Sequence, residues 1–101
     1  MRTAKVYVNG QFAGLLTEND GKRYSFEYLP DYSGASVSYT MPVIQNRFDF
    51  VSFPPFFEGL LPEGYNLDAM LKKQKIDKND YFSQLLAVGK DMVGDVTVNP
   101  A

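Results

Sequence analysis

Two acids, Glu58 and Glu63, are the residues whose type and spacing come nearest to catalytic chemistry in this chain. A carboxylate pair can act as general acid and general base when burial or a neighbouring charge shifts one of the two pKa values. The sequence gives neither acid such a companion, and acids that flank a short helix are usually solvated. The chain also has no histidine and no cysteine, which excludes the commonest nucleophile–base pairs and zinc sites. We therefore expect no catalytic residue, no metal and no cofactor.

A second candidate for chemistry is a cluster of four lysines, Lys72, Lys73, Lys75 and Lys78. Such a cluster can contact a phosphate, or it can be a solvated face favoured by the dipole at a helix C-terminus, and the second interpretation is the preferred one. None of the glycines forms a phosphate-binding loop. The net charge of −2 argues against direct binding of nucleic acid, which requires a basic face.

Length and composition are those of one globular domain spanning residues 1–101, with 45% apolar and 22% charged residues. The lack of cysteine suits a reducing compartment. No signal peptide is visible, and no apolar stretch approaches the roughly 20 residues that span a bilayer. We expect a cytoplasmic protein that does not contact a membrane.

The first half of the chain predicts an antiparallel sheet. Strands are expected at 5–9, 11–17, 23–29 and 36–41, with turns at Asn9-Gly10 and 18–21 and a break at Pro30-Asp31. In the third of these strands, Tyr24, Phe26 and Tyr28 alternate with polar residues, so they should share one face of the sheet.

The second half predicts three short helices and a last strand at 94–98, so the fold class is α+β. The first helix follows Pro54-Pro55, and its Phe57 and Leu61 should be buried on the sheet. The second helix carries Leu67, Met70, Leu71 and Gln74 on one side and ends near Lys75. The third is capped by Asn79 or Asp80, turns Phe82, Leu85 and Leu86 inward and stops at Gly89.

Tyr65 differs from the other aromatic residues, most of which should be core. It follows Gly64 in the first turn of the second helix, and at about 100° per residue it points nearly opposite to the apolar side of that helix. Two interpretations stay open: Tyr65 is an anchor for a binding partner, or it packs on the neighbouring helix.

Four segments of the sequence resemble the amino-terminal subdomain of HipA-type toxins. They are VYVNG (6–10) with its following GLL (14–16), YSFEY (24–28), FFEGLLPEG (56–64) and LLAVGKDMVGDV (85–96). They occur in the order of that family and cover nearly the whole chain. In HipA proteins a serine/threonine kinase body follows this subdomain, and no ATP-binding or catalytic segment of such a kinase is present in this sequence.

The resemblance implies a free-standing copy of the subdomain, similar to the small HipS antitoxins of three-component HipBST systems. Its partner would be a HipT-like kinase, with a HipB-like DNA-binding protein as a further candidate partner. We expect a non-enzymatic inhibitor that contacts the kinase through Glu58, Pro62, Glu63, Gly64 and Tyr65. The alternative is a structural subunit that assembles the kinase complex without inhibiting it. A small enzyme of another type is the least favoured interpretation.

Overall fold

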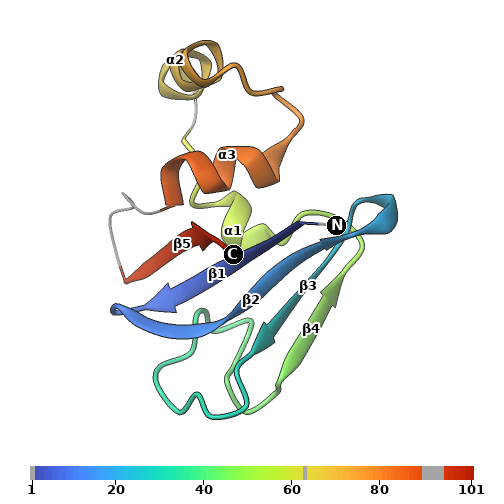
Figure 1. Cartoon of the computed structure of the whole chain (residues 1–101), viewed down its shortest axis with the longest axis vertical. Helices are drawn as coiled ribbons and strands as arrows, with labels where there is room; N and C mark the ends of the chain where they lie inside the picture. The colour runs from blue at the N-terminus through green and yellow to red at the C-terminus, as the bar shows by residue number, and fades with distance from the viewer. Residues whose placement is uncertain (1, 63, 90–94) are drawn as a thin grey trace.

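The computed structural model describes residues 2–62, 64–89 and 95–101 and confirms the predicted α+β class. A five-stranded antiparallel sheet in the order β4-β3-β2-β1-β5 carries α1 and α3 on one face, and α2 lies beyond α3 (Figure 1). The strands are β1 (Arg2–Val8), β2 (Gln11–Asn19), β3 (Arg23–Tyr28), β4 (Arg47–Phe50) and β5 (Val96–Pro100). The helices are α1 (Pro55–Glu58), α2 (Gly64–Gln74) and α3 (Tyr81–Val88), and a 3-10 turn, η1 (Asp20–Lys22), joins β2 to β3.

The predicted hairpin at Asn9-Gly10 is confirmed. Asn9 has φ 52° and Gly10 has φ 80°, the positive values that a two-residue turn of this kind requires. The turn alone would pair Arg2 with Thr17, but the register shifts between Val6 and Tyr7, so that Arg2 lies opposite Glu18. β2 continues to Asn19, which pairs with Arg23 of β3, and the next turn therefore lies later than the predicted 18–21.

The predicted strand at 36–41 is wrong, because the fourth strand is β4. Phe48 pairs with Phe26 and Phe50 pairs with Tyr24, so the aromatic alternation of β3 continues across the sheet. The 36–41 segment instead folds over the end of the sheet, with Val37 and Met41 buried. The Tyr28 hydroxyl accepts a hydrogen bond from the Val37 amide and donates one to the Met41 carbonyl. A side chain thus satisfies backbone groups that a strand would have paired.

The core lies between the sheet and the two helices that cover it. Phe57 from α1 and Phe82 and Leu85 from α3 are fully buried, as predicted, and the Phe57 ring lies 6.0 Å from that of Phe26. Leu61 is also buried, at 9% exposure. The aromatic face of β3 predicted from its alternation is confirmed, since Tyr24, Phe26 and Tyr28 are all buried.

The third helix ends at Gly89, as predicted, but for a different physical reason. Gly89 keeps a helical φ of −59° and is not a left-handed cap. A Cβ atom there would lie 2.3 Å from the Val98 carbonyl oxygen, so glycine lets the end of α3 approach β5 closely. The last strand begins at Val96; Gly94, where it was predicted to begin, lies outside the described residues.

Candidate partner-binding surface

The segment from α1 to Pro62 presents one apolar side to the core and one polar side to solvent. Pro54 precedes α1, and the amide of Glu58 donates to its carbonyl. Phe57 and Leu61 face the core, whereas Glu58 is exposed and Pro62 is half-buried. The structure therefore leaves Glu58 and part of Pro62 accessible to a partner.

The remaining predicted contact residues lie at the start of α2. Gly64 and Tyr65 form its first turn, directly after the corner at Pro62. Glu63 lies outside the described residues, and so does the position of the Tyr65 side chain. The backbone brings Pro62, Gly64 and Tyr65 together, and the role of Tyr65 stays a prediction.

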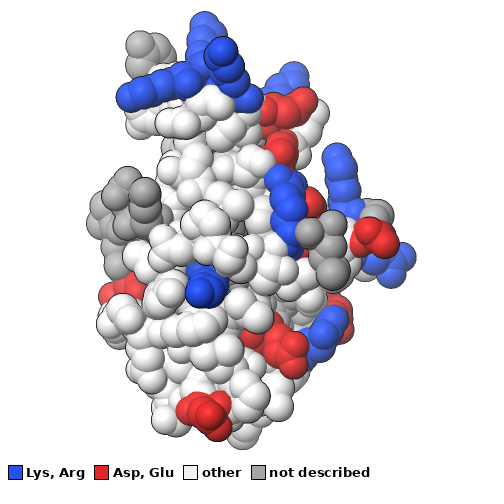
Figure 2. Space-filling model, in the orientation of Figure 1, with Lys and Arg blue, Asp and Glu red and all other residues white. Residues whose placement is uncertain are grey.

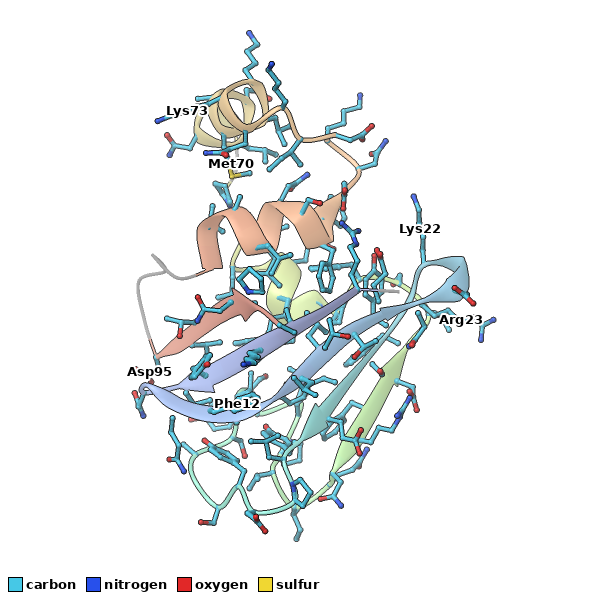
Figure 3. All side chains as sticks on the ribbon, viewed as in Figure 1. Phe12, Lys22, Arg23, Met70, Lys73 and Asp95 are labelled. Atoms are coloured by element: carbon cyan, nitrogen blue, oxygen red, sulfur yellow. The ribbon has the colours of Figure 1, made fainter. Side chains whose placement is uncertain are left out.

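Residues 66–80, here called the α2 arm, extend beyond α3 and include no buried residue. Leu67 and Leu71 are half-buried, and in Figure 3 Met70 points from α2 towards α3 while Lys73 points away. Leu67, Met70 and Leu71 thus agree with the predicted side of the helix, whereas Gln74, assigned to the same side, is exposed. The lysines at the end of α2 cover the tip of the arm (Figure 2). Their exposure agrees with a solvated basic face.

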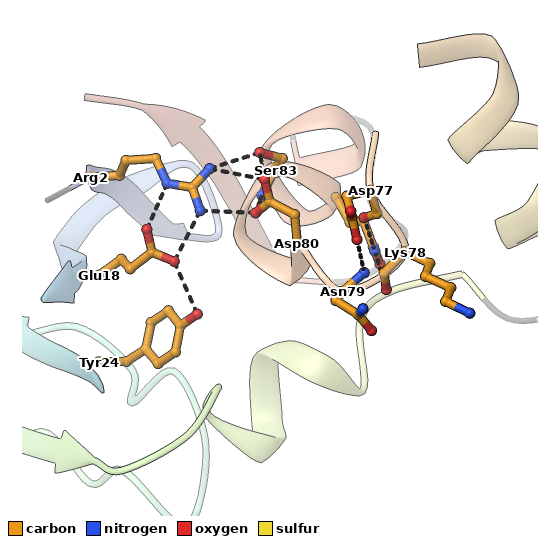
Figure 4. Close-up of polar contacts among 9 residues, drawn as sticks. Arg2, Glu18, Tyr24, Asp77, Lys78, Asn79, Asp80 and Ser83 are labelled. Atoms are coloured by element: carbon orange, nitrogen blue, oxygen red, sulfur yellow. Dashed lines mark hydrogen bonds and ion pairs between the residues drawn. The ribbon is translucent and has the colours of Figure 1, made fainter. Parts of the chain in front are cut away.

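A polar cluster, here called the Arg2 clamp, fastens the start of α3 to the sheet (Figure 4). The Arg2 guanidinium donates to both oxygens of Glu18, at 2.8 and 2.9 Å, and to Asp80 Oδ1 at 2.8 Å. It also donates to the Ser83 hydroxyl at 2.8 Å, and its Cζ lies 4.9 Å from the centre of the Phe82 ring. The Tyr24 hydroxyl donates to Glu18 at 3.1 Å. Side chains from β1, β2, β3 and α3 therefore meet in one network.

The clamp shifts the pKa values of its members. Hydrogen bonds from Arg2 hold the pKa of Glu18 below its usual range, against the opposing effect of burial. Burial alone would raise the pKa of Asp80, but hydrogen bonds from Arg2 and Ser83 outweigh it and lower that pKa. Burial and the bond to Glu18 raise the pKa of Tyr24 to about 12. Both acids are thus ionised and paired near neutral pH, as a structural tie requires.

Asp80 and Gln84 join the α2 arm to the body of the protein. Of the two predicted caps of α3, Asn79 and Asp80, the structure selects Asp80, whose carboxylate accepts a hydrogen bond from the Ser83 amide at 3.2 Å. The buried Gln84 side chain donates to the carbonyls of Asp77 and Lys78, at 3.2 and 3.1 Å. The base of the arm is therefore fixed, although its apolar side chains are only half-buried.

The roles of Arg2, Glu18 and Gln84 were not predicted from the sequence. At about 100° per residue, Gln84 lies nearly opposite to Phe82 and Leu85, on the side of the helix that local spacing assigns to solvent. It is buried because it bonds to the base of the α2 arm, a contact that no local pattern predicts. The pairing of Arg2 with Glu18 depends on the shifted register of the hairpin.

A second surface lies where α1, β4 and the 40–45 loop meet. A groove of about 290 Å³ is lined there by the apolar side chains of Met41, Phe48, Phe50 and Phe56 and by neighbouring polar residues. The largest exposed apolar side chains of the described residues lie close by in sequence: Tyr39, Ile44 and Val51, at 103%, 91% and 81% exposure. This part of the helix-covered face is incompletely covered by the chain itself.

The described residues contain no group of three or more acids that could hold a metal ion. Within the same part of the chain, no helix is long and apolar enough to cross a membrane. The ionised groups of the Arg2 clamp are paired with one another. What the geometry offers is a packed body with polar ties and two partly covered surfaces.

Comparison with known proteins gives the family. The sequence model described as the HipA N-terminal domain matches residues 4–99, and the chain belongs to this family. An uncharacterized protein of Haemophilus influenzae is 38% identical over 98 residues, which cover 97% of this chain and 92% of that protein. A solved structure described as the N-terminal domain of HipA toxin superposes with a TM-score of 0.79 at 33% identity. The match covers 100% of this chain and 93% of that one.

Proposed function

We propose that this protein is a non-enzymatic, HipS-like antitoxin that binds a HipT-like serine/threonine kinase and neutralises it in trans. The observation that carries the proposal is the family match over residues 4–99, which corresponds to the N-terminal domain of HipA and not to its kinase body. The Haemophilus influenzae relative supports a small separate protein of this kind, because this chain covers 92% of it.

Two partly covered surfaces support a role in docking. A domain that folds against a kinase body needs a face that remains incomplete without it, and the α2 arm has no buried residue of its own. In the sequence, the predicted contact residues Glu58, Pro62, Glu63, Gly64 and Tyr65 lie between the packed body and this arm. We place the kinase contact at these residues, where the Tyr65 ring would supply a rigid aromatic anchor.

Neutralisation would follow if the bound domain covered the cleft of the kinase or held the kinase in an inactive arrangement. Glu58 and Glu63 would pair with basic residues at the rim of the contact, where they add orientation more than affinity. The HipB-like DNA-binding protein is a further candidate partner, and the net charge of −2 disfavours direct binding of DNA by this chain.

Growth rescue tests the proposal. Expression of a HipT-like kinase alone should stop growth, and co-expression with this chain should restore it. A Phe57→Ala variant, whose folding should be compromised, serves as the control for a specific effect of the folded domain. Unrestored growth, with both proteins soluble, would contradict neutralisation.

The second candidate is an assembly subunit that binds the kinase without inhibiting it. It is favoured by the solved structure that this chain resembles, because that domain is part of a toxin and not of its inhibitor. A stable complex in cells whose growth stays arrested would select this candidate. Failure to form any complex would exclude both.

A further inference from the structure

The outer edge of β4 is a free sheet edge within the described part of the chain. The sheet order places β4 at one end, paired only with β3 (Figure 1). An edge of this kind presents unpaired amide and carbonyl groups that can pair with another strand. Its side chains decide which strand would fit.

Arg47 and Asp49 are the residues of β4 whose backbone amide and carbonyl groups point away from β3. The amide of Tyr28 donates to the Asn46 carbonyl at 2.9 Å, so the backbone groups of Asn46 point towards β3. Residues of an antiparallel strand alternate in direction, and Arg47 and Asp49 therefore turn their backbone groups away from β3. In agreement, the Arg47 carbonyl accepts a bond from the Gln45 side chain, at 2.9 Å, and not from β3.

These two residues make the edge complementary to itself. Two antiparallel copies of β4 can be centred on Arg47, Phe48 or Asp49. Centring on Arg47 or on Asp49 places like charges opposite each other, which is destabilising. Centring on Phe48 places each Arg47 opposite the Asp49 of the other copy. Both pairs can then exchange their backbone hydrogen bonds, with the Arg47 carbonyl released by the exposed Gln45 side chain. We propose that the protein self-associates through β4, as a two-fold antiparallel strand pair centred on Phe48.

Charge and apolar surface both fit this arrangement. The side chains of Arg47 and Asp49 are 52% and 71% exposed, and their 3.1 Å contact within one strand can be exchanged for contacts between strands. The half-buried Phe48 would meet its own copy at the two-fold axis. In an antiparallel pair the start of one β4 lies beside the end of the other. The exposed Ile44, just before β4 in one copy, would therefore lie near the exposed Val51, just after β4 in the other. This inference does not depend on the proposed kinase partner.

Sedimentation velocity from about 1 µM to about 1 mM tests the proposal on the purified chain. The wild type should shift from one chain mass towards two with rising concentration. Asp49→Arg places arginine opposite arginine and should raise the dimer dissociation constant at least about tenfold. Exchanging both residues, in the Arg47→Asp/Asp49→Arg variant, restores opposite charges and should restore association. Asp31→Arg, an exposed acid in a loop, is the matched control and should leave association unchanged.

A mixing experiment gives the sharpest outcome. Arg47→Asp alone and Asp49→Arg alone should each be monomeric, whereas an equimolar mixture of the two should form a heterodimer. Melting curves show whether each variant is folded, which matters most for Arg47→Asp because Arg47 lies 3.8 Å from Glu27. A wild type that stays monomeric at all concentrations would overturn the proposal, and so would a dimer that neither charge reversal weakens. In the former case the charges of β4 only prevent pairing with another sheet edge.

Discussion

The body of the protein, formed by the sheet with α1 and α3, and the α2 arm use apolar residues differently. Phe26, Phe57 and Phe82 of the body are fully buried, and the Arg2 clamp ties its elements together. The apolar residues of the arm, Leu67 and Leu71 among them, are only half-buried. Folding free energy should therefore come from the body, whereas binding free energy should come from the arm and the corner that joins it to the body.

The largest expected effect separates the two regions by stability. Phe57→Ala removes a fully buried ring and should lower the free energy of unfolding by about 3–5 kcal/mol. Leu71→Ala in the arm should cost less than about 1.5 kcal/mol, because its side chain is only half-buried. Urea denaturation of both variants measures the difference. Equal losses would mean that the arm is as much a part of the folding core as the body.

The next effect distinguishes the arm and its corner from the body by their contribution to kinase binding. Tyr65→Ala should weaken binding to a HipT-like kinase by at least about 2 kcal/mol, the usual threshold of a binding hot spot. Its melting temperature should stay near that of the wild type. Calorimetric titration and a melting curve on the same variant provide both values. A lowered melting temperature with unchanged affinity would place Tyr65 in the core, and the Pro62–Tyr65 corner would then no longer be the proposed contact site.

A smaller effect tests the Arg2 clamp as the tie between sheet and α3. Arg2→Ala should lower the free energy of unfolding by about 1–2 kcal/mol, less than for a fully buried pair because Arg2 keeps 39% side-chain exposure. Arg47→Ala is the matched control, since it also removes an arginine paired with an acid, at 52% exposure. It should cost less than about 0.5 kcal/mol. If the two variants lose the same stability, the clamp is only a surface feature.

The smallest effect is the pH dependence of the clamp. The pKa values of Glu18 and Asp80 are lowered by folding, so their contribution is present above the ordinary carboxyl range and is lost as pH falls through the folded values. The pKa of Tyr24 is raised from 10.0 to about 12, so its contribution is present below pH 10 and is lost between these values. Melting temperatures of wild type and Glu18→Gln across pH should show a weaker acid dependence in the variant. Identical curves would contradict this assignment.

Local signals predicted most of the body. Asn9-Gly10 predicted the hairpin, the alternation of Tyr24, Phe26 and Tyr28 identified a buried strand face, and a cap at residue 79 or 80 located α3. The fourth strand was missed because β4 has only four residues and is defined by its aromatic pairing with β3, a contact between distant segments. Residues 36–41 resembled a strand because apolar and polar residues alternate there. Val37 and Met41 are indeed buried, but a tyrosine hydroxyl and not a strand partner bonds their backbone.

The candidate contact surface was predictable only in its local part. The orientation of α2 follows from residue spacing, whereas the contact role of the Pro62–Tyr65 segment stays a prediction. The Arg2 clamp does not, because a one-residue shift in the hairpin register decides whether Arg2 lies opposite Thr17 or Glu18. Its third member, Asp80, comes from a helix far along the chain, and no local pattern predicts that approach.

The most direct test of a kinase-binding domain is a binding measurement on the two purified proteins. Size-exclusion chromatography with light scattering on a mixture of this chain and a HipT-like kinase should give a 1:1 complex, stable at micromolar concentration. A contact of ordinary size, burying about 800 Å² on each partner, is sufficient for such stability. Separate elution of the two proteins at micromolar concentration would contradict the proposed function.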